Sequence, residues 1–89
     1  MSNCSNHPKE LYGESDMAKV AEAISNLHYE TLAKLLYELK EKIYYDSVKD
    51  RKAGRTNLAH ILGNAVTHFH YAAFEIETAW QISKPFMKE

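Results

Sequence analysis

The sequence of 89 residues has few of the residues that cross-link a chain or break a helix: one cysteine (Cys4), three glycines and two prolines. A lone cysteine cannot form a disulfide within the chain and nearly excludes a cysteine-based zinc site, so a reducing, cytoplasmic compartment is expected. The scarcity of glycine argues against a glycine-rich phosphate loop. It also leaves room for long uninterrupted helices.

Long apolar runs and an excess of one charge are also missing. No segment approaches the roughly 20 apolar residues that cross a membrane, and residues 1–10 contain no apolar signal core. Lys and Arg number 11 against 12 Asp and Glu, so the formal net charge is -1. A membrane partner is therefore not expected, and neither is DNA or RNA binding driven by counterion release.

Helical periodicity dominates the rest of the sequence and predicts one all-α domain over residues 1–89. Residues 1–14 are polar and are expected to form an extended arm. A short helix is predicted over residues 15–26, with Ser15 or Asp16 as its N-cap. The pair Ser25-Asn26 favours caps and turns, so the helix is expected to break there.

Two long antiparallel helices are predicted over residues 28–51 and 57–83, joined by a short turn. Gly54 is the expected left-handed stop of the first, and Thr56 or Asn57 the cap of the second. Each helix has an apolar stripe at three- and four-residue spacing. The stripes contain Leu32, Leu35, Leu36, Leu39 and Ile43 in the first, and Leu58, Leu62, Ala65, Phe69, Ala72, Ile76 and Ala79 in the second.

Aromatic side chains exceed what this fold can cover. Tyr71 and Phe74 fall outside the stripe of the last helix, because successive helical residues are about 100° apart. Surplus aromatic area is typical of protein–protein contacts. We therefore expect a homo-oligomer, the alternative being a compact three-helix monomer with half-exposed tyrosines.

The histidines and hydroxyl residues do not form a pattern typical of a metal or catalytic site. His68 and His70 leave a helix on nearly opposite sides, and no His-x-x-x-His or Glu-x-x-His spacing occurs. No nucleophile lies in a recognisable turn. We expect neither an enzyme nor a bound cofactor or metal.

The arm holds the best candidate for ligand binding. Lys9 supplies a cation, Tyr12 an aromatic ring, and the helix start near Ser15 backbone N–H groups, a combination that suits a phosphorylated ligand with a base to stack. The alternative is that Tyr12 is a hydrophobic staple against the helix and Lys9 a solvated charge. A second basic cluster, Arg51, Lys52 and Arg55, surrounds the turn between the long helices and complements the helix C-terminus there.

In its organisation the chain resembles the phage anti-CBASS cyclic-nucleotide sponges, whose helical hairpin is partly shared with anti-Thoeris sponges. The stretch "ELYGES" corresponds to the arm, "YETLAKLLYEL" to the first long helix, and "GRTNLAHILGNAV" to the start of the second. The resemblance implies a cytoplasmic homohexamer in the infected host. Such a protein captures cyclic di- or trinucleotide signals without cleaving them, and so blocks bacterial antiviral signalling.

The resemblance also implies site residues. Tyr12 is the expected stacking residue, Lys9 or Lys19 the phosphate partner, Asn26 and Thr31 further polar contacts, and Arg55 a second anion site. The rival hypothesis is a small helical oligomer that binds and inhibits or adapts a host protein through its aromatic surface, with no small ligand. Tyr12 separates the two hypotheses, because only the first needs it for ligand binding.

Overall fold

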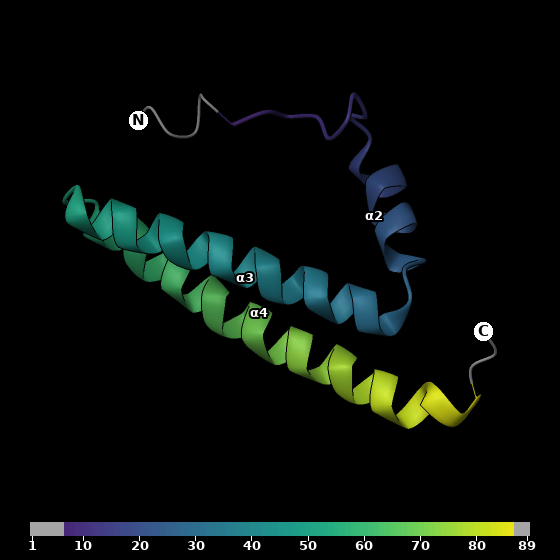
Figure 1. Ribbon diagram of the computed structural model, residues 1–89. Helices are drawn as coiled ribbons and strands as arrows, with labels where there is room; N and C mark the ends of the chain where they lie inside the picture. Colours follow the sequence, from purple (N-terminus) through teal and green to yellow (C-terminus); the bar gives the residue numbers. More distant parts are fainter. Residues whose placement is uncertain (1–6, 87–89) are drawn as a thin grey trace.

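The structure, a computed structural model, describes residues 7–86 and is built from helices (Figure 1). The elements are α2 (Met17–Ser25), α3 (Tyr29–Lys52), α4 (Thr56–Ser83) and the short 3₁₀ helix η1 (Lys84–Phe86). The expected all-α class, with two long helices packed together, is confirmed. Cys4 and the first six residues of the expected arm lie outside the described residues.

The helices α3 and α4 run antiparallel and side by side, as the two arms of a hairpin (Figure 1). The turn between them contains Gly54 at φ 87°, in the left-handed region that the sequence predicts for it. Helix α2 leaves the open end of the hairpin at an angle (Figure 1). The Cα atoms extend over 49 × 28 × 14 Å, so the molecule is flat and has little interior.

Each helix begins in a different way. The side chain of Asp16 accepts a hydrogen bond from the Ala18 N–H, which starts α2 at Met17 rather than at residue 15. Nδ1 of His28 accepts from the Glu30 N–H at 3.2 Å and so caps α3. The expectation that Thr56 or Asn57 caps α4 is wrong, because the N-cap is Arg55 and no side chain caps this helix.

Small residues form the contact between the long helices. The buried apolar side chains in the described part of the chain are Ala33, Ala59 and Ala73, and the last two have no exposed area. Ser47, also buried, donates a hydrogen bond from Oγ to the carbonyl of Ala59 at 3.0 Å. Alanines allow two helices to approach closely but bury little apolar area, so this contact alone stabilises the fold only weakly.

The stripe that the sequence predicts for α4 lies to one side of the contact with α3, and five of its seven residues are half-buried. Leu58 and Ala72, two of its members, are exposed, while Ala59 and Ala73, each one residue further along, are buried. The leucines of α3 are likewise only half-buried or exposed, and Ala33 occupies the contact. The physical reason is that the hairpin closes on its smallest side chains, which leaves the bulky ones on its two broad faces.

We name these faces by their residues. The aliphatic face consists of the apolar residues of the two predicted stripes, which are half-buried or exposed in the structure. It contains a shallow groove, lined by Leu36, Ala65, His68, Phe69 and Ala72. The aromatic face contains Tyr37, Tyr44, His70, Tyr71 and Phe74. The hairpin thus has two surfaces of different chemistry, and both are open in a single chain.

Candidate functional site

The arm forms a tight turn at Leu11–Glu14, where the sequence predicts only an extended segment. The N–H of Leu11 donates to the Glu14 carbonyl, and the N–H of Glu14 to the Leu11 carbonyl, both at 2.9 Å. The two residues between them have positive φ, 51° at Tyr12 and 81° at Gly13. This is the pattern of a hairpin turn whose central positions favour glycine, asparagine and aspartate.

Tyr12 is an unusual occupant of such a turn. A bulky residue at positive φ is disfavoured by contact between its Cβ and the backbone. Its side chain is 101% exposed, so both faces of the ring are open to solvent. The hydrophobic-staple interpretation of Tyr12 is therefore wrong. A strained residue that makes no packing contact is an observation from which a functional role can be inferred.

The start of α2 does not offer the anion site that the sequence suggests. The carboxylate of Asp16 accepts from the Ala18 N–H at 3.0 Å, and a carboxylate oxygen of Glu14 accepts from the Asp16 N–H at 2.9 Å. Two acidic groups thus hold the N–H groups of Asp16 and Ala18 and make the start of α2 negative. A phosphate near Tyr12 therefore needs a cationic side chain as well as any remaining N–H group.

The remaining predicted contacts are accessible but dispersed. Lys9, Lys19 and Thr31 are exposed, as is Asn26, which forms the C-cap of α2. Asn26 also lines an open cavity of about 430 Å³ with Leu27, His28 and Tyr29. Within residues 7–86, no hydrogen bond or ring contact joins Tyr12 to any of these four residues. One chain therefore presents them on separate elements, with Lys9 in the arm, Lys19 and Asn26 on α2 and at its end, and Thr31 in the first turn of α3.

Arg55 is held by an acidic partner that the sequence analysis did not identify. Its Nε and Nη2 atoms lie 2.9 and 2.8 Å from Oδ1 of Asp50. Asp50 is only 4% exposed. The N–H of Arg55 also donates to the Asp50 carbonyl at 2.8 Å. The guanidinium is partly exposed and locks the turn, while Arg51 and Lys52 beside it are exposed.

The arm and the hairpin meet at a cavity of about 300 Å³ near the turn. His7 lines it from the arm, and Leu58 and Leu62 line it from α4. Lys42, Asp46, Lys49 and Asp50 complete the lining from α3. Lys42 is paired with Asp46 at 2.6 Å, so part of the charge in this cavity is internally compensated. The arm thus approaches the turn end of the aliphatic face through His7.

A chain of polar contacts connects the two long helices across the aromatic face. The hydroxyl of Tyr37 donates to Oε1 of Glu77 at 3.2 Å, and the Tyr37 ring packs edge-on against His70. Desolvation, together with the hydrogen bond and negative charge of Glu77, raises the pKa of Tyr37 above its ordinary value. A shallow cleft of about 280 Å³ lies next to these residues and is lined by Lys40, Val66, Thr67, His70 and Tyr71.

The open end of the hairpin is closed by Trp80. Its indole contacts the His28 imidazole, with ring centroids 4.4 Å apart, and the Lys84 ammonium lies 5.5 Å from the centroid of the indole. Trp80 is half-buried. It therefore joins the start of α3 to the end of α4 and belongs to the fold rather than to the exposed aromatic surplus.

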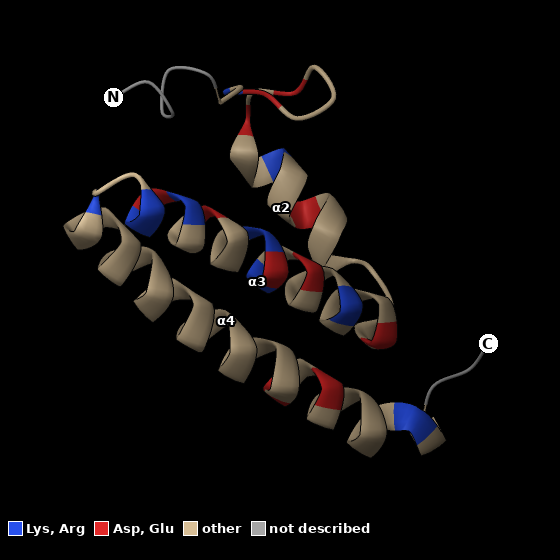
Figure 2. Cartoon of the chain, turned by 60° about the vertical axis from the view of Figure 1, so that its left-hand side comes forward, with Lys and Arg blue, Asp and Glu red and all other residues tan. Residues whose placement is uncertain are grey.

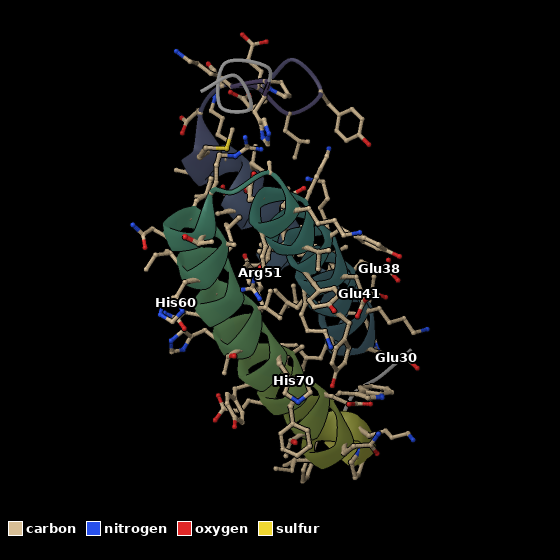
Figure 3. The ribbon with its side chains drawn as sticks, turned by 90° about the vertical axis from the view of Figure 1, so that its left-hand side faces the viewer. Glu30, Glu38, Glu41, Arg51, His60 and His70 are labelled. Atoms are coloured by element: carbon tan, nitrogen blue, oxygen red, sulfur yellow. The ribbon has the colours of Figure 1, made fainter. Side chains whose placement is uncertain are left out.

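Neither a metal site nor a membrane-spanning segment is found in the described part of the chain. Among residues 7–86, no three His, Cys, Asp or Glu side chains come together in a way that would hold an ion. His60 and His70 leave α4 in different directions (Figure 3). None of the described helices is long and apolar enough to cross a bilayer.

Comparison of the chain with models of protein families, with curated proteins and with solved structures finds no match. The candidate site is therefore defined by the geometry of this chain alone.

Two features of the site were missed at the level of sequence. The turn at Tyr12 had a local signal in Gly13, because glycine is a strong marker of turns. The Asp50–Arg55 pair had only the presence of opposite charges on the two sides of Gly54. Neither signal specifies that Asp50 is buried or that the Tyr12 ring is exposed.

Proposed function

We propose that this protein sequesters cyclic oligonucleotide signals without cleaving them, and that Tyr12 stacks on a base of the ligand. The observation that supports this most directly is the presentation of a fully exposed Tyr12 ring on a strained two-residue turn. An aromatic ring with open faces can stack on any of the bases, and such stacking contributes about 1–3 kcal/mol of binding free energy per base.

The acidic residues near the arm determine which groups can bind the phosphates of the ligand. Glu14 and Asp16 make the start of α2 acidic, so the phosphates of the ligand must be met by Lys9 or Lys19. Asn26 and Thr31 supply further polar contacts. Arg55 can offer a second anion contact only through the guanidinium N–H groups that Asp50 does not hold. Because these groups are dispersed in one chain, the complete site is assembled from several copies of a homo-oligomer, which the resemblance gives as a hexamer.

The test is thermal unfolding of the purified protein with cyclic and linear dinucleotides. A ligand at a hundred times its dissociation constant adds about 2.7 kcal/mol to the free energy of unfolding, which shifts the melting temperature measurably. Tyr12→Ala should abolish the shift given by cyclic dinucleotides. Tyr45→Ala, which removes another exposed tyrosine far along α3, should leave it unchanged. Mass spectrometry of the ligand after heat release should find it intact.

A second candidate function has its own supporting observation. Tyr71 and Phe74 are exposed on the aromatic face, where the Lys40–Tyr71 cleft provides a small depression. Such a surface suits a protein partner. Absence of any nucleotide-dependent shift, with an unchanged melting curve for Tyr12→Ala, would favour this interaction module over the nucleotide-binding protein.

A further inference from the structure

Helix α4 lacks charge over most of its length. From Thr56 to Phe74 it contains no Asp, Glu, Lys or Arg, and Figure 2 shows this part of the helix without a coloured residue. Charged residues of both signs lie along α3 instead (Figure 2). A helix on the outside of a soluble monomer normally carries charge on its solvent side. The composition of α4 is therefore typical of a helix that packs against neighbours on more than one side.

The exposed area of the chain is larger than its mass requires. A compact monomer of 10.3 kDa has an accessible surface of roughly 5,400 Å² by the usual scaling. This chain has 7140 Å². The difference exceeds the ~800 Å² that one partner contributes to a standard protein–protein interface. The surplus reflects the elongated shape of the chain, to which the projecting arm contributes as well as the open faces of the hairpin.

The aliphatic face has the shape that such a contact needs. Its groove is about 410 Å³ in volume and is lined by Leu36 of α3 and by Ala65, Phe69 and Ala72 of α4, with His68 as the one polar lining residue. Beside it, Leu39 is exposed and Leu32 and Leu35 are half-exposed on α3. A groove with alanine walls thus lies next to a ridge of leucines on the same side of the hairpin.

We propose that the aliphatic face binds the aliphatic face of a second copy of this chain, with the leucine ridge of each copy in the Ala65–Ala72 groove of the other. A two-fold axis brings the same patch of both subunits together, so one surface must supply both ridge and groove. This face does so, and ridges of side chains packed into grooves are the normal mode of helix packing.

The charge pattern favours a second copy over an unrelated partner. The groove lining has no charged side chain with which to select a charged partner. The cavity at His7, Lys42 and Asp46 lies at the turn end of the hairpin and is lined by charged side chains. The uncharged apolar part of the face therefore runs from the middle of the hairpin toward its open end. The aromatic face remains accessible in the resulting dimer.

The decisive variant is Ala72→Glu, with Phe74→Glu as its matched control. Both residues are exposed on α4 in a single chain, and they point about 160° apart around the helix. Light scattering of the ligand-free protein should give a multiple of 10.3 kDa for the unchanged chain and for Phe74→Glu. Ala72→Glu should reduce the mass to a lower multiple or to a single chain, because two buried carboxylates would face each other.

A wild-type mass of one chain would overturn the proposal, because the groove would then be covered by α2 or open to solvent. An unchanged mass for Ala72→Glu with a reduced mass for Phe74→Glu would also overturn it and would assign the contact to the aromatic face. The inference specifies the subunit contact that the proposed function needs. Because the test uses no nucleotide, its failure is distinguishable from a failure of ligand binding.

Cross-linking provides a second test if Ala72→Glu does not fold. In a Cys4→Ser background, Ala72→Cys should be joined between copies by a short bismaleimide, whereas Phe74→Cys should stay largely monomeric on a denaturing gel. Both substitutions keep a small or medium uncharged side chain at an exposed position, so both variants should fold. Efficient cross-linking of Phe74→Cys but not of Ala72→Cys would contradict the proposal.

Discussion

The His28 imidazole lies edge-on to the Trp80 indole with centroids 4.4 Å apart, while Nδ1 of the same imidazole caps α3 through the Glu30 N–H. One side chain thus starts a helix and closes the open end of the hairpin. The two roles can be separated by substitution, because asparagine is a good N-cap but has no ring.

We predict that His28→Ala lowers the free energy of unfolding by about 2 kcal/mol, of which about 1 kcal/mol is the lost cap and the rest the lost ring contact. His28→Asn should recover the cap contribution only. Urea unfolding monitored by circular dichroism measures both differences. Equal losses for the two variants would show that Nδ1 does not act as a cap.

The turn between α3 and α4 should depend on the Asp50–Arg55 pair. Arg55→Ala leaves the buried Asp50 carboxylate without its guanidinium partner, and we expect it to cost about 1–2 kcal/mol of unfolding free energy after allowance for the partial exposure of Arg55. Arg51→Ala, an exposed basic residue four positions away, should change stability by less than about 0.5 kcal/mol. Chemical denaturation of both variants at one salt concentration provides the comparison. Similar losses of stability for Arg55→Ala and Arg51→Ala would mean that the Asp50–Arg55 contact adds nothing beyond the positive charge near the helix end.

Tyr12→Asn should separate stability from ligand binding. Asparagine tolerates positive φ better than tyrosine, so the variant should gain about 1 kcal/mol in unfolding free energy without ligand. It should also lose the ring, and with it about 10- to 100-fold in affinity for cyclic dinucleotides. Tyr12→Phe keeps the ring and should bind normally. Calorimetric titration and thermal melting together test this, and a stabilised Tyr12→Asn that binds like the wild type would remove Tyr12 from the site.

Stability at alkaline pH should depend on Tyr37. Its pKa is raised by desolvation and by Glu77, so the folded state favours the neutral phenol. The contribution of this group is therefore fully present below the unfolded pKa of about 10. It is lost as the pH rises through the folded value.

Between pH 8 and about pH 11, the wild type should lose more unfolding free energy than Tyr37→Phe, which has no phenol to ionise. Tyr45→Phe, which removes an exposed hydroxyl with no carboxylate partner, should follow the wild type. Denaturant titrations at several pH values measure the slopes. Parallel slopes for the wild type and Tyr37→Phe would show that the Glu77 contact does not persist in solution.

The sequence predicts the helices better than it predicts what they contact. The left-handed stop at Gly54 and the break at Ser25-Asn26 follow from local backbone preferences, and the structure has both. The stripe of α4 is correct in its period but offset in its direction, because Ala59 and Ala73 are buried in place of Leu58 and Ala72 while the other five members are half-buried. Periodicity identifies an apolar side of a helix without saying which neighbour covers it.

The candidate site illustrates a similar limit. Tyr12 was identified from its chemical surroundings in the sequence, but its positive φ and full exposure depend on hydrogen bonds between Leu11 and Glu14 that no composition rule specifies. The acidic character of the α2 start could have been inferred, because Glu14 and Asp16 flank Ser15 in the sequence. The expected N–H site overlooked that a capping carboxylate competes with an external anion for the same donors.

The uncharged stretch of α4 also has a consequence for how the protein behaves in solution. The chain has a formal net charge of only -1, so the mixed charges of α3 contribute hydration of the surface rather than repulsion between particles. A copy that has come away from its partners exposes the uncharged helix without that protection. Prolonged heating at high protein concentration should therefore lead to aggregation of dissociated copies, and the useful lifetime of such a preparation would be set by the rate of subunit dissociation.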